Sequence, residues 1–452
     1  MKNIFKIIPV DIIIVFIAIY IVLPPFIESK PITLTYAALF FAYFIYLFIK
    51  GNLTKIIIIM AYFYYGTPSM GSDHTGAISY ILPTTMLSLS IIGIFNKLYE
   101  AKVSAFLKFG KTEILMLLFF LLLNIIDDGI FYSYYNLFII SFFANRIIVC
   151  RSNINTDELF VGFRILLFIQ FIIILLERLF FYRAYPSVFE DYTSLEALRC
   201  SGYTGHPLVL SSFFIMYAIL LFIISSWKKK FYIIDTILLV ISCIFLSSRT
   251  PLIIILLVCI SSFLLYIRHN IFKALLIILT IVISFTYIIN NSEMATIYMD
   301  TSDRIENSDA DQRLGAFDIT SKVIEKEPLG IGLYDKDVFR KKMYQLNIHS
   351  TDLFSVDMAL IDNSFLTSLI SFGIFGLLIF HFLFAPIVHS YKILDKRITK
   401  ISLCMIVCIF IMINFSFDMI FYQYLMLLFF VFTNLIVTID KNERKILISQ
   451  KS

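Results

Sequence analysis

Charged residues are scarce in this chain of 452 residues. Asp, Glu, Lys and Arg make up 15% of the sequence, whereas hydrophobic residues make up 60%. So little charge excludes an ordinary soluble globular protein, whose surface needs more of it. The formal net charge is +5. Because this excess sits in basic loops between apolar segments, it gives no reason to expect nucleic acid as a partner.

Several chemical signatures are missing as well. The sequence contains no Walker loop and no dinucleotide fingerprint, so neither ATP nor a redox nucleotide is implied. None of the six cysteines has metal-ligand spacing, and the acidic run "DTSDRIENSDADQR" does not match a calcium loop. We therefore expect no cofactor and no metal. Only Cys200 is expected outside the membrane, where a disulfide would have no partner.

Long apolar runs, by contrast, are abundant. Runs of about 16 to 22 residues recur along the whole chain and alternate with polar loops. They predict an all-α integral membrane protein, in which residues 1–452 form a single polytopic helical bundle of about 12–14 transmembrane helices. The first run lacks a small-residue cleavage site and predicts a retained anchor. The candidate spans are 8–25, 33–49, 54–66, 77–95, 112–126, 131–149, 157–176, 207–226, 231–247, 251–267, 272–290, 364–388, 401–416 and 419–438.

Basic residues indicate the orientation of the bundle, because cytoplasmic loops retain Lys and Arg. With the N-terminus inside, every inner loop is basic or carries paired basic residues, as in "WKKK" and "YKILDKRITK". The short outer loops "GTPSMGSDHTG" and "IDDG" carry neither Lys nor Arg. We therefore expect both termini to lie in the cytoplasm.

Two outer loops are unusually long, a medium loop at 177–206 and a large loop at 291–361. Loops of this size are uncommon unless they are functional. Within the large loop, "GAFDITSKVIEKEP" predicts an amphipathic helix that Pro328 ends. A helical wheel separates an apolar arc of about 160° from a charged side: Ala316, Phe317, Ile319, Val323 and Ile324 against Asp318, Lys322 and Glu325.

Arginine is disfavoured on the outer side of a membrane, so the outer arginines need an explanation. Arg199, Arg249 and Arg313 are all expected outside, whereas Arg164 lies within a span. Snorkelling to lipid headgroups would explain Arg199 and Arg249 one at a time, and a salt bridge between helices would explain Arg164. Together with Asp362, the outer arginines instead suggest an anion-binding, outward-facing cavity, because the guanidinium fork matches phosphate oxygens.

Polar residues also open the apolar stretch "ALIDNSFLTSLISFGIFGLLIF", at Asp362, Asn363 and Ser364. One interpretation is that Asp362 or Asn363 caps the helix that follows. The other is that Asp362 faces a reacting group, and one residue can serve both purposes. Further along, Gly373 and Gly376 are expected to permit close helix packing.

Four stretches, in chain order, resemble the polysaccharide polymerase and O-antigen ligase superfamily: "RCSGYTGHPLVLSSFF", "SSRTP", "QRLGAFDITSKVIEKEPLGIGLYDKDVF" and "IDNSFLTSLISFGIFGLLIF". More specifically, the chain is similar to the Wzy-type repeat-unit polymerases of capsule, exopolysaccharide and O-antigen pathways. The resemblance covers residues 160–390 or so. Ligases of this superfamily usually carry His where Asp362 stands, which favours a polymerase.

The resemblance implies a glycosyltransferase of the bacterial cytoplasmic membrane. Such enzymes join oligosaccharide repeat units carried on undecaprenyl diphosphate, moving the growing chain from its lipid diphosphate to a hydroxyl of the next unit. The outer arginines would neutralise the departing diphosphate, and Asp362 would take the hydroxyl proton. His206 and Asn363 are further candidates for substrate binding, although His206 before Pro207 also suits a helix start at headgroup level.

Two other functions stay open. A ligase would transfer finished glycan to another acceptor from much the same site. A flippase that delivers the lipid-linked units would suit about fourteen spans, but the large outer loop and the lack of repeat symmetry count against it. For a polymerase, the expected partners are the undecaprenyl-diphosphate-linked oligosaccharide and membrane lipids, with a chain-length regulator and a flippase as candidate protein partners.

Overall fold

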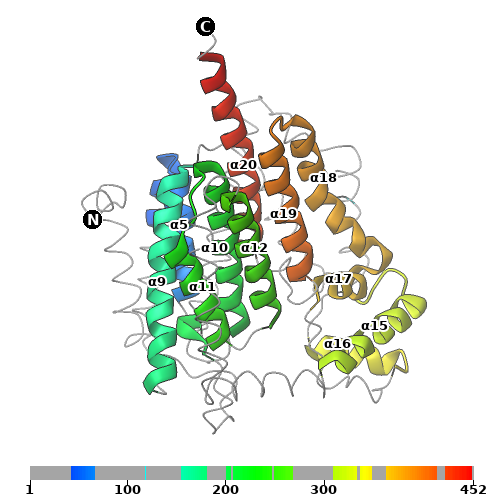
Figure 1. The fold of residues 1–452 in the computed structure, drawn as a ribbon. Helices are drawn as coiled ribbons and strands as arrows, with labels where there is room; N and C mark the ends of the chain where they lie inside the picture. The colour runs from blue at the N-terminus through cyan, green and yellow to red at the C-terminus, as the bar shows by residue number, and fades with distance from the viewer. Residues whose placement is uncertain are drawn as a thin grey trace.

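The fold is seen in a computed structural model, which describes residues 42–66, 118, 154–180, 200–204, 207–246, 249–267, 309–332, 336–348, 363–414 and 423–449 (Figure 1). Every regular element in these ranges is a helix, which confirms the all-α class. The elements are α5 (Leu53–Gly66), α9 (Thr156–Phe180), η5 (Gly202–Thr204), α10 (Pro207–Lys228), α11 (Ile233–Phe245), α12 (Arg249–Ile267), α15 (Asp309–Lys326), α16 (Lys336–Gln345), α17 (Ser364–Phe372), η7 (Gly373–Gly376), α18 (Leu377–Ile393), α19 (Arg397–Asn414) and α20 (Gln423–Ser449).

The predicted spans agree with these helices wherever the chain is described, except at 364–388. Five stretches are long and apolar enough to cross a membrane, and three shorter apolar helices accompany them. The chain is therefore a multi-pass membrane protein. The predicted spans that lie wholly or mostly outside the described residues are 8–25, 33–49, 77–95, 112–126, 131–149 and 272–290.

The predicted span over 364–388 is apolar enough to cross a membrane, but it is not one continuous helix. The stretch Ser364–Ile393 is apolar enough to cross a membrane, but Gly373, at φ 59°, ends α17, and the short 3-10 helix η7 follows. With nine residues, α17 is about 14 Å long, less than half of the roughly 30 Å hydrocarbon core. Only α18 continues through the bundle, while α17 lies beside α15 and α16 at the end away from the C-terminus (Figure 1).

Helix α10 forms the centre of the bundle. Of its apolar window, 94% is buried, against 44% for α9, so α10 is enclosed by protein whereas α9 keeps an exposed side. Helices α5, α9, α11, α12, α19 and α20 all contact it, α12 most extensively. An evenly apolar helix is expected in such a position, since it has no polar face to present to water.

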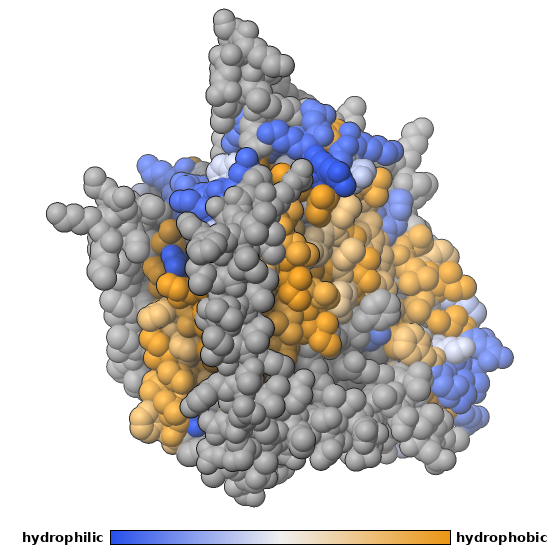
Figure 2. Space-filling model, viewed as in Figure 1, coloured by the Kyte–Doolittle hydropathy of each residue, from blue (hydrophilic) through white to orange (hydrophobic). Residues whose placement is uncertain are grey.

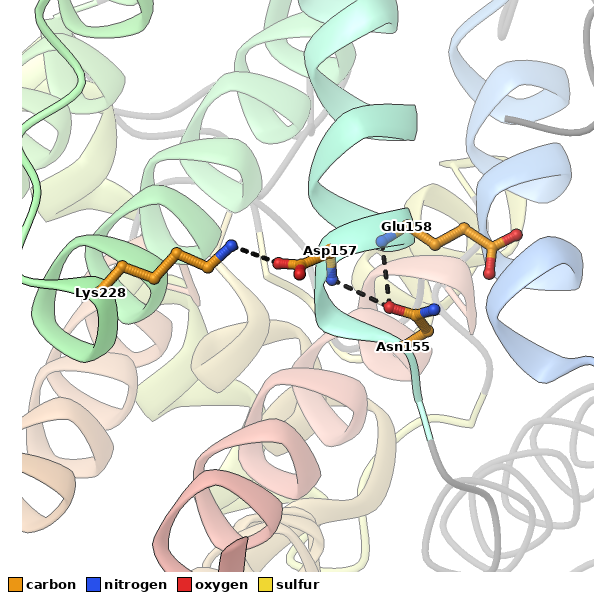
Figure 3. Close-up of polar contacts among 4 residues, drawn as sticks. All are labelled: Asn155, Asp157, Glu158 and Lys228. Atoms are coloured by element: carbon orange, nitrogen blue, oxygen red, sulfur yellow. Dashed lines mark hydrogen bonds and ion pairs between the residues drawn. The ribbon is translucent and has the colours of Figure 1, made fainter. Parts of the chain in front are cut away.

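The start of α9 is fastened to its neighbours by polar contacts (Figure 3). The side-chain oxygen of Asn155 accepts the backbone N–H groups of Asp157 and Glu158, at 3.1 and 3.2 Å, which caps the helix. Asp157 also forms an ion pair with Lys228, the last residue of α10. The backbone N–H of Asn155 donates to Thr54 Oγ1 at the start of α5 (2.9 Å). These three helix termini therefore lie at the same end of the bundle.

The turn between α18 and α19 lies at this end too. Asp440 of α20 is fully buried, and its carboxylate accepts the backbone N–H of Lys396 (3.2 Å) and the hydroxyl of Thr399 (2.8 Å). The basic segments 50–55, 226–230 and 392–400 are thus gathered together, and we call this the basic end. Figure 2 shows hydrophilic residues covering the upper end of the molecule above a wide apolar belt.

Candidate functional site

The opposite end of the bundle is organised around α17. The segment 328–332, which follows α15, is bound to the C-terminal end of α17 by backbone hydrogen bonds. The N–H of Ile331 donates to the carbonyl of Ile370 (2.8 Å), and that of Ile374 donates to the carbonyl of Pro328 (3.2 Å). The orphan carbonyls at the end of a helix need such partners. Two stretches that lie far apart in the sequence, "EPLGIG" and "SFGIFG", therefore interlock.

Glycine makes this interlock sterically possible. A Cβ atom on Gly373 would lie 1.8 Å from the carbonyl oxygen of Pro328, and one on Gly330 would lie 2.4 Å from that of Ser371. Both glycines have positive φ, at 59° and 86°, which other residues adopt only with strain. Close packing was expected at Gly373, but this glycine ends α17 and admits a loop backbone.

We expect Gly373→Ala to reduce the free energy of unfolding by at least about 2 kcal/mol, from the left-handed φ and the steric overlap together. Gly51 is a matched control, because it also has positive φ (69°) but no atom lies within 4 Å of the place that a Cβ would take there. Gly51→Ala should therefore cost only the conformational part, about 1–2 kcal/mol. Thermal unfolding of the purified proteins in detergent compares the two. Equal losses would contradict the interlock.

The predicted amphipathic helix is present as α15, and it ends at Lys326, two residues before Pro328. Its buried face is narrower than predicted. Ala316, Ile319 and Val323 are buried, whereas the side chain of Phe317 is 50% exposed, so its assignment to the buried face is wrong. On a helical wheel Phe317 falls at the edge of the apolar arc. The neighbouring helices cover only about the central 100° of this arc.

Two faces of α17 explain why this helix is held at the end of the bundle. Leu366 and Ile370 form a separate hydrophobic cluster with residues of α15 and α16. The opposite face of α17 carries four hydroxyl residues, spaced at positions 0, 3, 4 and 7 of the helix. All four are buried: Ser364, Thr367, Ser368 and Ser371. Such a polar face is costly in lipid but acceptable against protein. Helix α17 therefore packs between helices α15 and α16 on one side and the turn that leads to α18 on the other.

Asn363 is the N-cap of α17. Its backbone is extended (φ −150°, ψ 106°), and its side-chain oxygen accepts the N–H groups of Phe365 (3.0 Å) and Leu366 (3.3 Å). The side chain is largely buried, at 8% exposure. Of the two candidates for the capping residue, Asn363 is therefore the one that caps, and Asp362 precedes the cap. A capping function is not needed to explain the carboxylate of Asp362.

The medium loop is anchored near the end of α9 by a buried carboxylate. Glu177 Oε2 accepts the backbone N–H groups of Ser201 and Gly202, both at 2.9 Å. The N–H of Cys200 donates to the carbonyl of Phe245 (3.4 Å), the last residue of α11. Residues 200–204 are thereby placed beside the end of α11, at the end of the bundle opposite to the basic end.

The structure describes only some of the predicted site residues. Asp362, Arg199 and His206 lie outside the described residues. Arg249 is the first residue of α12 and Arg313 lies in the first half of α15, but neither side chain belongs to the described part. Their convergence on one cavity therefore stays a prediction. The backbone hydrogen bond between Cys200 and Phe245 does bring together two residues that lie close in the sequence to Arg199 and to Arg249, respectively.

Arg164, the arginine within a span, forms a salt bridge between helices, as expected. Its Nε lies 2.8 Å from Oδ1 of Asp235 in α11, and the hydroxyl of Tyr217 in α10 donates to the same oxygen (2.7 Å). Asp235 is buried, so the ion pair and the hydrogen bond together offset its loss of hydration. Arg164 is thus accounted for by helix association near the basic end.

Two structural features were not predicted from the sequence. The anchoring role of Glu177 has no local signature, because its partners lie 24 and 25 residues further along the chain. The hydroxyl face of α17 does have one, since Ser or Thr at spacing 0, 3, 4 and 7 indicates one side of a helix. That spacing could have shown that the apolar stretch after Asn363 begins with a helix packed on protein.

Comparison with known families agrees with this geometry. A family model described as O-antigen ligase matches residues 234–381. The matched region contains α12, α15, α16, α17 and the interlock, together with the positions of Arg249, Arg313 and Asp362. No curated protein matches the chain.

Proposed function

We propose that the chain is a repeat-unit polymerase of the O-antigen polymerase/O-antigen ligase superfamily, which the match at residues 234–381 supports. In this proposal it joins undecaprenyl-diphosphate-linked oligosaccharides into capsule, exopolysaccharide or O-antigen polysaccharide. The reaction takes place at the outer face of the cytoplasmic membrane of a bacterium.

One observation supports a specific role for Asp362 in this proposal. Asn363 supplies the cap of α17, so capping is not required of the preceding carboxylate of Asp362. Helix α17 is itself fixed by its cluster with α15 and α16 and by the interlock at its C-terminal end. A rigid support for a reacting group is what catalysis by positioning requires.

The proposed chemistry exchanges one bond at the anomeric carbon of the donor chain. The bond from this carbon to the diphosphate oxygen breaks, and a bond to the acceptor hydroxyl oxygen forms. Asp362 takes the hydroxyl proton, and Arg199, Arg249 and Arg313 stabilise the negative charge on the departing undecaprenyl diphosphate. His206 is proposed to contact the glycan. Asn363 contributes mainly by holding α17, because its side-chain oxygen already accepts two backbone N–H groups.

A ligase is the second candidate, because the matching family is described by that activity. The two are distinguished by supplying the purified protein with two differently labelled populations of lipid-linked units and no other acceptor. A polymerase produces chains that contain both labels. A ligase leaves every unit separate until a different acceptor is added, and that result would reject the polymerase proposal.

The proposal also requires the α17 end to face outward. In a cysteine-free background, Ser321→Cys should react with an impermeant thiol reagent in intact cells, because Ser321 is exposed on α15. Lys230→Cys, exposed at the basic end, should react only after the cells are opened. The background must lack the native cysteines, since Cys404 and Cys408 are exposed on α19. Labelling at position 230 in intact cells would reverse the orientation.

A further inference from the structure

The basic end contains a cavity of about 170 Å³ between the end of α10, the start of α19 and the middle of α20. Its polar lining comprises two lysines and three hydroxyl residues: Lys229, Lys396, Ser226, Thr399 and Ser402. The rest of its wall consists of Trp227 and four isoleucines. A lining that combines cationic groups with a branched apolar surface suits an amphipathic anion.

Trp227, the only tryptophan of the chain, marks the depth of this cavity. Tryptophan side chains favour the headgroup level of a membrane, where the ring is buried and the N–H is wet. The neighbouring Lys228 lies with its Nζ 5.7 Å from the ring centre and is paired with Asp157 (Figure 3). Lys228 is therefore engaged by α9 and does not line the cavity, whose lining contains Lys229 and Lys396.

The backbone at Lys229 is in an unusual conformation. It has φ 52°, in the left-handed region that glycine adopts most readily at the end of a helix. The N–H of Lys230 closes the helix end by donating to the carbonyl of Ser225 (3.3 Å). Glycine would fit this turn without strain, but it would bring no charge to the cavity. The end of α10 thus carries a cation in the lining of the cavity, at a position where glycine would fit without strain.

The second cation is held by a fixed turn. Asp440 accepts the backbone N–H of Lys396 and the hydroxyl of Thr399, so the two residues that line one side of the cavity are tied to α20. Because the carboxylate of Asp440 is fully buried and bonded to these donors, it orders the part of the cavity whose lining includes Lys396.

We propose that this cavity binds the phosphate headgroup of an anionic phospholipid of the inner leaflet. Phosphate oxygens would contact the ammonium groups of Lys229 and Lys396, and the isoleucine surface would accept the first part of an acyl chain. Basic pockets between transmembrane helices on the cytoplasmic side are suited to such headgroups. Soluble phosphate shares the polar chemistry, but it would make no use of the apolar wall. The site is separate from the one proposed for glycan transfer.

The test uses the full-length protein in neutral detergent and measures the thermal unfolding midpoint against added lipid. Phosphatidylglycerol should raise the midpoint of the parent more than phosphatidylcholine does. Lys229→Gly and Lys396→Gln should each weaken the apparent affinity for phosphatidylglycerol by about fivefold. Without lipid, the midpoint of Lys229→Gly should stay close to that of the parent, because glycine fits the left-handed turn. This separates loss of a ligand from loss of the fold.

Lys230→Gln is the matched control, since it removes the same charge from the next residue, which does not line the cavity. It should keep the affinity of the parent. An equal loss in this control, or an equal response of the parent to both lipids, would overturn the proposal. Inorganic phosphate alone should have little effect, and a full shift with phosphate would identify a soluble anion as the ligand and reject the lipid.

Discussion

Asp362→Asn is expected to leave lipid-linked repeat units as monomers, with the rate of chain extension lowered by about 10²–10⁴-fold. The amide has nearly the size of the carboxylate but cannot accept the proton of the acceptor hydroxyl near neutral pH. The variant should still express, enter the membrane and bind the units, because substrate binding is assigned mainly to the arginines. The initial rate with purified protein and undecaprenyl-diphosphate-linked units measures the effect.

Asn363 provides the control for this experiment. Asn363→Ala removes the oxygen that caps α17, so it should lower the free energy of unfolding by about 1 kcal/mol while the carboxylate of Asp362 remains. Asn363→Asp keeps a good cap and should resemble the parent. Asp362→Asn should show the reverse pattern, with stability unchanged and activity lost. If Asp362→Asn extends chains at the parent rate, the proton acceptor is a different group.

Arg249→Ala should lower the rate by about 10²–10³-fold, the usual cost of removing one group that stabilises a developing negative charge. Arg249→Lys should recover only part of this loss, because lysine keeps the charge but lacks the planar fork that binds two phosphate oxygens. Both variants should fold, since Arg249 is the first residue of α12 and no turn of the helix precedes it. The rate at saturating concentration of units is the quantity to compare.

Arg397 is a matched control for Arg249. It too is the first residue of a helix, α19, but it lies at the basic end. Arg397→Lys and Arg397→Ala should therefore leave the rate of chain extension unchanged. Equal effects at both positions would mean that arginine supports helix insertion rather than the reaction, and the anion site at the α17 end would lose its main support.

The sequence predicts the described helices well because the hydrocarbon core imposes one strong requirement, about 20 consecutive apolar residues. The same requirement explains why the break at Gly373 within 364–388 was not predicted. In an apolar run, Gly373 indicates either close packing or a helix end, and the choice depends on the carbonyl of Pro328, which comes from a distant part of the chain. Hydropathy alone therefore predicts one helix where the chain forms the separate helices α17 and α18.

The candidate site was predictable in part. The sequence placed polar groups before an apolar helix but could not decide between Asp362 and Asn363 as the cap, because both side chains make good caps. The structure decides for Asn363 through two hydrogen bonds to backbone N–H groups. The width of the buried face of α15 was overestimated at Phe317, since a helical wheel shows angles but not the extent of the partner surface.

The central claim is that this membrane protein extends glycan chains rather than moving their precursors. The most direct measurement is product length after purified, full-length protein is reconstituted in vesicles with undecaprenyl-diphosphate-linked repeat units alone. We expect a ladder of products with increasing numbers of units, which is absent with Asp362→Asn. Units that cross between leaflets while remaining single, with parent and variant alike, would contradict the claim.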